Sequence, residues 1–317
     1  MNEILNEYLT NTIANLTDIS RKFKVSKEEI IQMLHDNKYY AASNGKKKSS
    51  VIALHDASEE YYNSDEKITF IALSKKYKVN STTLKNYYLQ YYPEKCWNLD
   101  TTVFDNIDSE EKAYWLGFIY ADGYIGSSPI NPNSKKVSYN FEVGLQASDV
   151  EHLKKLKNFL KFTGNIQLTD TVCRLRITNK HLWESLNKLG CTPRKSLTLQ
   201  FPDESIFKES SRYSKLDLIR HFIRGYWDGD GCLTFKRPTY PSISVISTEN
   251  FINSIQNYIR ISGNIYNNSE ENTITKKLMY NGEKAFKVTD YLYSNCNIYL
   301  NRKYDRYLAY CRIYEKS

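Results

Sequence analysis

A nine-residue motif that occurs twice is the feature that most constrains the fold of this chain. The two copies read Trp115-Leu-Gly-Phe-Ile-Tyr-Ala-Asp-Gly123 and Ile223-Arg-Gly-Tyr-Trp-Asp-Gly-Asp-Gly231. Each copy is a mainly apolar helical run that has a glycine at its third position and ends in aspartate and glycine. Two copies separated by the length of a small domain predict two similar halves, each with a carboxylate at the end of a helix.

Other landmarks repeat in the same order. Lys195 and Lys303 are separated by the same interval as the two motif copies, and a Gly-Asn-Ile segment at 164–166 returns at 263–265. Hydrophobic periodicity then predicts the same succession of elements twice, αββαββα, with antiparallel strands. We therefore predict an α+β fold with one subdomain at 109–200 and a second at 201–317.

The region before residue 96 contains a second, weaker repeat. Residues 19–30 align with residues 73–84, and in each a helix ends before a Lys-Val pair. Ser26 or Asn80 would then cap the next helix. This predicts two helix-turn-helix-like modules, at 1–42 and 66–95, with linkers at 43–65 and 96–108.

The second helix of a helix-turn-helix can enter the major groove of DNA. The residues that we expect to contact DNA in this way are Lys27, Ser81, Thr82, Thr83 and Lys85. A pair of plain helical hairpins that pack but touch no DNA is the alternative.

Small residues line one face of each motif helix. The residues are Ala113, Gly117 and Ala121 in the first copy, and Gly225 and Gly229 in the second. Small residues spaced by four let two helix backbones approach more closely than the usual distance of about 8–10 Å. The pattern therefore predicts that the two motif helices pack on each other.

Such packing would place Asp122 and Asp230 side by side. Two carboxylates at the negative ends of two helix dipoles repel each other, and a divalent cation that prefers oxygen ligands removes the repulsion. We therefore expect Mg²⁺, for which Mn²⁺ can substitute, at a metal site formed by Asp122 and Asp230 with the adjoining Gly123 and Gly231. The alternative is that each aspartate only ends its helix in an Asp-Gly turn.

Basic and polar residues could assist chemistry on a phosphodiester. Lys195 and Lys303 could neutralise charge in the transition state, and Gln146, at the end of a strand, could orient a water molecule. A β-ribbon fits the major groove, and the basic residues on or beside strands are Lys135, Lys136, Arg174, Arg176, Lys236, Arg237, Lys276 and Lys277. For any one of these residues, an ordinary place on the solvated surface is the alternative.

The bulk composition is compatible with this interpretation. The chain has 317 residues and a net charge of +8, which allows two or three domains and favours a polyanionic partner. Its six cysteines have no C-x-x-C spacing, so neither a zinc site nor a disulfide framework is indicated. With no signal peptide or apolar stretch of membrane-spanning length in the sequence, we expect a reducing intracellular compartment, cytoplasmic or organellar.

At these residues the chain resembles the LAGLIDADG homing endonucleases. The resemblance covers roughly 109–315 and rests on WLGFIYADG at 115–123 and IRGYWDGDG at 223–231. It implies a single-chain enzyme that cleaves double-stranded DNA at a long, nearly palindromic site and leaves short 3′ overhangs. It also implies that Asp122 and Asp230 bind the metal, with Lys195, Lys303 and Gln146 in support. The sequence departs from the motif at Trp115, Ile223, Arg224 and Tyr120.

Two other functions are compatible with the sequence. One is a transcription regulator that binds DNA without cutting it, for which loss of the motif acids would be the expected sign; both acids are present. The other is an RNA-binding intron maturase, since the family includes splicing cofactors.

Overall fold

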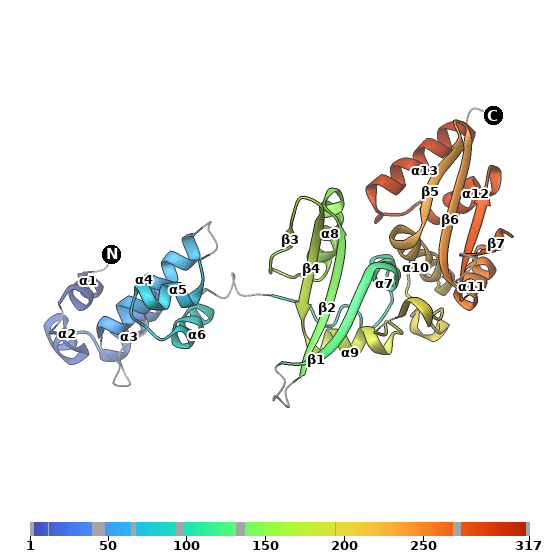
Figure 1. Ribbon diagram of the computed structural model, residues 1–317. Coiled ribbons are helices and arrows are strands. Elements are labelled where there is room, and N and C mark those ends of the chain that lie inside the picture. Colours follow the sequence, from blue (N-terminus) through green and yellow to red (C-terminus); the bar gives the residue numbers. More distant parts are fainter. Residues whose placement is uncertain are drawn as a thin grey trace. The chain divides into compact units, whose positions relative to one another are not determined.

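The computed structural model describes residues 3–11, 13–39, 48–64, 68–92, 98–130, 137–193, 195–268 and 274–314. The chain divides into two compact units, residues 1–97 and 98–317 (Figure 1). Among the described helices, none combines the length and the apolar character that crossing a membrane requires.

The first half of the larger unit has one four-stranded antiparallel sheet. Its strand order is β1-β2-β4-β3, and β2 pairs with β4 from Asn140–Thr178 to Gln146–Val172. Its elements are α7 (Glu110–Asp122), β1 (Gly123–Pro129), β2 (Val137–Gln146), α8 (Val150–Phe159), β3 (Gln167–Leu168), β4 (Val172–Thr178) and α9 (Lys180–Lys188).

The second half repeats this plan. Its sheet has the order β5-β6-β8-β7, again antiparallel. The elements are α10 (Lys215–Asp230), β5 (Cys232–Arg237), β6 (Tyr240–Thr248), α11 (Glu249–Ile259), β7 (Asn264–Asn267), β8 (Thr275–Asn281), α12 (Glu283–Tyr293) and α13 (Asn301–Tyr314). The predicted α+β class and the repeated αββαββα order are confirmed; α13 is an additional helix at the end.

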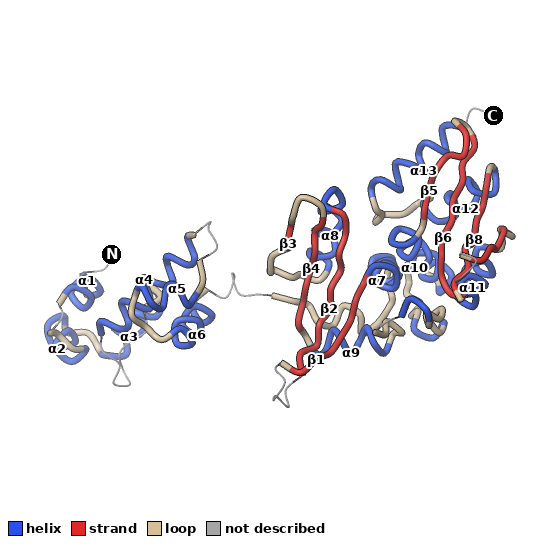
Figure 2. The backbone as a smooth tube through the Cα atoms, in the orientation of Figure 1, coloured by secondary structure: helices blue, strands red, loops and turns tan. Residues whose placement is uncertain are grey.

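The motif helices α7 and α10 lie side by side between the two sheets (Figure 2). One hydrophobic core runs through both halves, and every residue of α7 from Ala113 to Tyr120 is buried in it. A helix that is apolar around its whole circumference is stable only when it is covered on all sides. The motif helices therefore form the centre of this unit.

The smaller unit contains two three-helix modules. The first consists of α1 (Glu3–Thr10), α2 (Leu16–Phe23) and α3 (Lys27–Asp36), and the second of α4 (Lys48–Asn63), α5 (Phe70–Lys76) and α6 (Ser81–Tyr91). Each module has its own hydrophobic cluster. The pair α2–α3 returns as α5–α6 at the interval that the sequence repeat predicts.

Both predicted linkers are wrong in part. Within 43–65, residues 48–63 form α4, because Val51, Leu54 and Ala57 make an apolar stripe that is buried against the module. Residues 43–47 lie outside the described residues. Within 96–108, Phe104 and Ile107 are buried in the core of the larger unit, and Ile107 forms a β-bridge with Phe207. From residue 98 onward, that segment is thus part of the folded unit.

Candidate active site

The two motif helices touch through their glycines. A Cβ atom added at Gly117 would lie 1.9 Å from the carbonyl oxygen of Phe222, and one at Gly225 would lie 1.9 Å from that of Tyr114. Each glycine thus contacts the other helix in the same way, as expected if the two halves are related by a two-fold axis. The backbones therefore approach as closely as a residue without a side chain allows.

The small residues beyond the glycines continue this contact. Ala113 is fully buried, and a Cβ atom at Gly229 would lie 2.3 Å from that of Ala121. The same atom would lie 3.2 Å from Oδ2 of Asp122. The Asp122 carboxylate therefore lies against the last turn of α10, which itself ends at Asp230.

The environment of these two carboxylates opposes their ionisation. Burial, and then the negative charge of Asp230, raises the pKa of Asp122 to about 6. Desolvation also raises the pKa of Asp230, against a hydrogen bond from Tyr226. In the described part of the chain, no cluster of three or more His, Cys, Asp or Glu side chains suitable for a metal is found. Any cation here would be held by this pair together with other oxygen atoms.

Both predicted lysines lie at the carboxyl ends of the motif helices. Lys195 Nζ donates a hydrogen bond to the carbonyl oxygen of Gly123. Lys303 Nζ donates to the carbonyl oxygens of Trp227 (2.7 Å) and Asp228 (2.5 Å). Positive charge is stabilising at the negative end of a helix dipole. Each lysine thus holds the end of a helix while its charge lies close to the motif acids.

Burial makes these lysines weaker bases than usual. Desolvation lowers the pKa of Lys195, and it lowers the pKa of Lys303, which is only 3% exposed, to about 8. Asp122 and Asp230 oppose both shifts. The charged acids and the charged lysines therefore stabilise one another within one site.

The site opens into two hollows with different chemistry. The first, the Asp122 hollow, is lined by Asp122, Gln146, Asp149, Arg174 and Arg302, among others. The second, the Asp230 hollow, is lined by Asp230, Lys195, Tyr226, Ile246, Ser247 and Thr275, among others. Each motif aspartate thus has its own opening, and among the described lining residues arginine occurs only in the first.

Gln146 is held in place inside the Asp122 hollow. Its Nε2 donates to Oδ2 of Asp149 (3.1 Å), which also accepts a bond from Nε of Arg302 (3.0 Å). At the equivalent register position of the second sheet stands Thr248, whose buried hydroxyl donates to the carbonyl oxygen of Leu199. The position of Gln146 therefore has no glutamine counterpart in the second half.

The structure places the two motif copies on two helices that touch through their glycines and end in the two motif aspartates. Residues 115–189 match the family model described as LAGLIDADG endonuclease. The chain is similar to the LAGLIDADG endonucleases. This match confirms the resemblance that the motifs indicated.

Solved structures of LAGLIDADG proteins align with about two thirds of the chain. The I-LtrWI homing endonuclease bound to target DNA has 14% identity, covering 66% of this chain and 92% of its own, with a TM-score of 0.46. Meganuclease I-SmaMI bound to uncleaveable DNA has 16% identity, covering 64% and 90%, with a TM-score of 0.44. I-GzeII in complex with a DNA target has 13% identity, covering 66% and 98%, with a TM-score of 0.37. No curated protein sequence matches the chain.

The predicted basic residues on the two sheets of the larger unit lie in varied surroundings. Arg174 and Arg176 project from the open face of the first sheet, where Nη2 of Arg176 lies 2.6 Å from a carboxylate oxygen of Glu142. Lys236 and Arg237 are exposed on β5, whereas Lys276 donates to Asn267 and Lys277 is half-buried. Lys135 and Lys136 lie outside the described residues.

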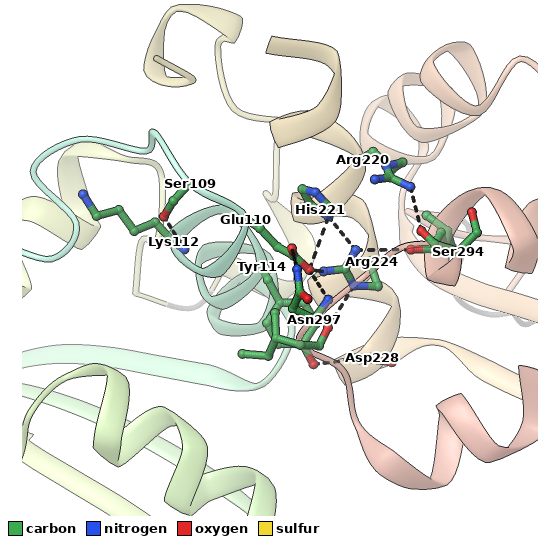
Figure 3. A network of polar contacts seen from close by, with 12 residues as sticks. Ser109, Glu110, Lys112, Tyr114, Arg220, His221, Arg224, Asp228, Ser294 and Asn297 are labelled. Carbon is green, nitrogen blue, oxygen red and sulfur yellow. Dashed lines mark hydrogen bonds and ion pairs between the residues drawn. The ribbon is translucent and has the colours of Figure 1, made fainter. Parts of the chain in front are cut away.

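Sequence reasoning missed a buried ionic network that joins the two motif helices (Figure 3). Arg224, one of the departures from the motif, is fully buried and lies 2.8 Å from Oε1 of Glu110, at the start of α7. Asn297 donates two further hydrogen bonds of 2.7 Å to Glu110, and Nη1 of Arg224 contacts Nδ1 of His221. The signal available in the sequence was the charged Arg224 within an apolar helical run, but the sequence did not show which residues would pair with it.

The network shifts the pKa values of Glu110 and His221. Burial opposes ionisation of Glu110, but its bonds from Asn297 and the charge of Arg224 outweigh this and lower its pKa. Burial and the charge of Arg224 lower the pKa of His221 to about 3, so this histidine is neutral. A second buried acid, Asp228, accepts bonds of 2.6 Å from Tyr114 and Tyr293. These groups join the two halves and are separate from the motif acids.

Proposed function

We propose that this chain is a site-specific endonuclease that hydrolyses phosphodiester bonds in double-stranded DNA, with a divalent metal held by Asp122 and Asp230. The observation that carries the proposal is the close contact at Gly117 and Gly225, which brings two desolvated carboxylates to one end of the helix pair. Burial and mutual repulsion oppose the ionisation of these two carboxylates. A divalent cation bound between them would remove the repulsion and offset part of the desolvation cost, so the pair suits such an ion.

The oxygen atoms present suit Mg²⁺, or Mn²⁺ in its place. The two carboxylates would bind it, with the carbonyl oxygens of Gly123 and Gly231 and the substrate phosphate as further oxygen ligands. When bound, such an ion activates water and stabilises the leaving oxygen in phosphodiester hydrolysis. Lys195 and Lys303 add positive charge near the phosphate, where it opposes the charge that develops during the reaction.

The fold supplies a surface for a duplex with two related half-sites. Each half presents the open face of an antiparallel sheet, and a β-ribbon can read base edges in the major groove. Because one chain contains both halves, a monomer completes the site, and the two half-sites would be nearly palindromic. Arg174 and Arg176 on the first sheet are suited to contact guanine or phosphate.

Gln146 has a distinct role in this proposal. Since its amide nitrogen donates to Asp149, its amide oxygen is left to accept a hydrogen bond from a water molecule in the Asp122 hollow. The hydroxyl of Thr248, at the equivalent position of the second half, already donates to a backbone carbonyl. The two DNA strands would therefore meet unequal sites. The resemblance implies short 3′ overhangs and a role in intron homing.

The experiment that tests the function is cleavage of a randomised DNA library in Mg²⁺, in Ca²⁺ and in EDTA, with sequencing of all ends. Discrete ends with short 3′ overhangs that form only with Mg²⁺ or Mn²⁺ are expected. Retention of specific DNA with no cutting in any metal would instead indicate the regulator. RNA-dependent stimulation of intron splicing without DNA cleavage would indicate the maturase.

A further inference from the structure

The two three-helix modules of the smaller unit share one turn geometry. Lys24 and Lys78, which the repeat places at equivalent positions, both adopt the left-handed conformation, with φ of 54° and 52°. In both modules the N–H of the following valine donates to the carbonyl of an equivalent serine, from Val25 to Ser20 and from Val79 to Ser74. The turn between the helices is therefore the same in α2–α3 and in α5–α6.

The exposed faces of the second helices differ sharply in charge. Glu28, Glu29 and Asp36 of α3 are exposed carboxylates, and the residues at the equivalent positions of α6 are Thr82, Thr83 and Gln90. Amides occupy the next equivalent pair, Gln32 and Asn86, and both are exposed. The described residues of α6 contain no acid, and Lys85 on its exposed face is basic.

Duplex DNA distinguishes between two such faces. Hydroxyl and amide groups can donate to and accept from base edges, whereas carboxylates close to the phosphates are repelled. The basic residues near the turn between the helices do not distinguish the two modules. Arg21, Lys22 and Lys24 in the first module correspond to Lys75, Lys76 and Lys78 in the second. The second helix therefore decides which module can enter a groove.

We infer that the module formed by α4, α5 and α6 is a second binding site for duplex DNA, which places α6 in the major groove, and that the module formed by α1, α2 and α3 does not read bases. Thr82, Asn86 and Gln90 face the base edges, and Lys85 contacts a phosphate. Lys27, followed directly by Glu28 and Glu29, makes no base contact. This inference needs no cleavage, and so it stands apart from the proposed endonuclease activity.

One pair of variants tests it in the full-length chain. Asn86→Glu and Gln32→Glu make the same charge change at equivalent, exposed positions, and thermal melting checks that both variants fold. The DNA is a fragment retained from the random library in Ca²⁺, and the measurements are affinity and a hydroxyl-radical footprint. Asn86→Glu is expected to weaken binding by at least tenfold and to remove protection over one outer segment, while Gln32→Glu stays within twofold of the wild type.

A third variant measures the bond to the phosphate. Lys85→Ala should reduce the slope of log affinity against log salt by about one unit, the change expected when the protein neutralises one phosphate fewer. Equal losses of affinity in Asn86→Glu and Gln32→Glu, or no loss in either, would overturn the inference. Because the central footprint and any cleavage report on the larger unit, failure of the endonuclease proposal would be seen separately.

Discussion

Replacing either motif glycine with alanine should destabilise the larger unit severely. The added Cβ at Gly117 or Gly225 would lie 1.9 Å from a backbone carbonyl oxygen, where ordinary contact begins at 3.4 Å. A carbonyl within a helix cannot rotate away, so the helices themselves must separate. Overpacking of a core costs about 1–3 kcal/mol or more, and alanine regains about 1 kcal/mol of helix propensity. Because the clash is with a fixed backbone carbonyl, we expect an overpacking cost of about 4 kcal/mol, above the usual range, and therefore a net loss of about 3 kcal/mol.

Urea and thermal unfolding measure this loss. For a unit of this size, about 3 kcal/mol corresponds to a decrease in Tm of roughly 6–12 °C. Gly144→Ala is the matched control, since a Cβ there would lie 3.6 Å from Cγ of Arg174, which is ordinary contact. It should change the free energy of unfolding by less than about 1 kcal/mol.

The double variant carries a further condition. Because one separation of the helices relieves both clashes, Gly117→Ala with Gly225→Ala should cost clearly less than the sum of the single variants. Wild-type stability of either single variant would refute the packing argument. If the losses of the two single variants simply add in the double variant, the two glycine contacts are not relieved by one common separation of the helices.

Three further predictions concern the charged groups. Asp122→Asn should raise the Tm of the metal-free protein at pH 7.5, and this gain should vanish near pH 4. The reason is that the folded pKa of about 6 lies above the unfolded value of about 3.9, so ionisation of Asp122 destabilises the folded state only as the pH rises above the unfolded value. A gain independent of pH, in melts with EDTA, would contradict this. Arg224→Met should cost about 3–5 kcal/mol in urea unfolding because it leaves the buried Glu110 carboxylate without its positively charged partner. Adding Glu110→Gln should recover part of this loss, and no recovery would show that the ion pair is not the cause. Gln146→Ala should slow cleavage of one DNA strand more than the other, so that nicked plasmid accumulates, whereas equal slowing of both strands would contradict the unequal hollows.

The sequence predicted those parts of the fold in which a pattern repeats. The motif copies and their glycines indicated the packed helices, and the shorter repeat before residue 96 indicated α2–α3 and α5–α6. Helix α4 was missed because its apolar stripe follows a basic, polar segment and because it lies outside the repeat that aligns residues 19–30 with residues 73–84. The contact between Glu110 and Arg224 was missed because its partners are 114 residues apart, and only the packing of α7 on α10 brings them together.

The lysines show a different limit. Their spacing predicted a place beside the site, but not that Lys195 and Lys303 would hold the carbonyl oxygens at the helix ends. Such contacts depend on the path of the chain after α9 and before α13, which a single sequence does not specify. The inequality of the two hollows likewise became visible only when the strand registers placed Thr248 at the position equivalent to Gln146.

The most direct test of the central claim is the cleavage rate of the single variants Asp122→Asn and Asp230→Asn on the DNA site obtained from the library, with binding measured in Ca²⁺ alongside. Each variant is expected to lose cleavage while its affinity for DNA remains within a few fold of that of the wild type. If either variant cuts at a rate close to that of the wild type, the two motif carboxylates do not form the metal site.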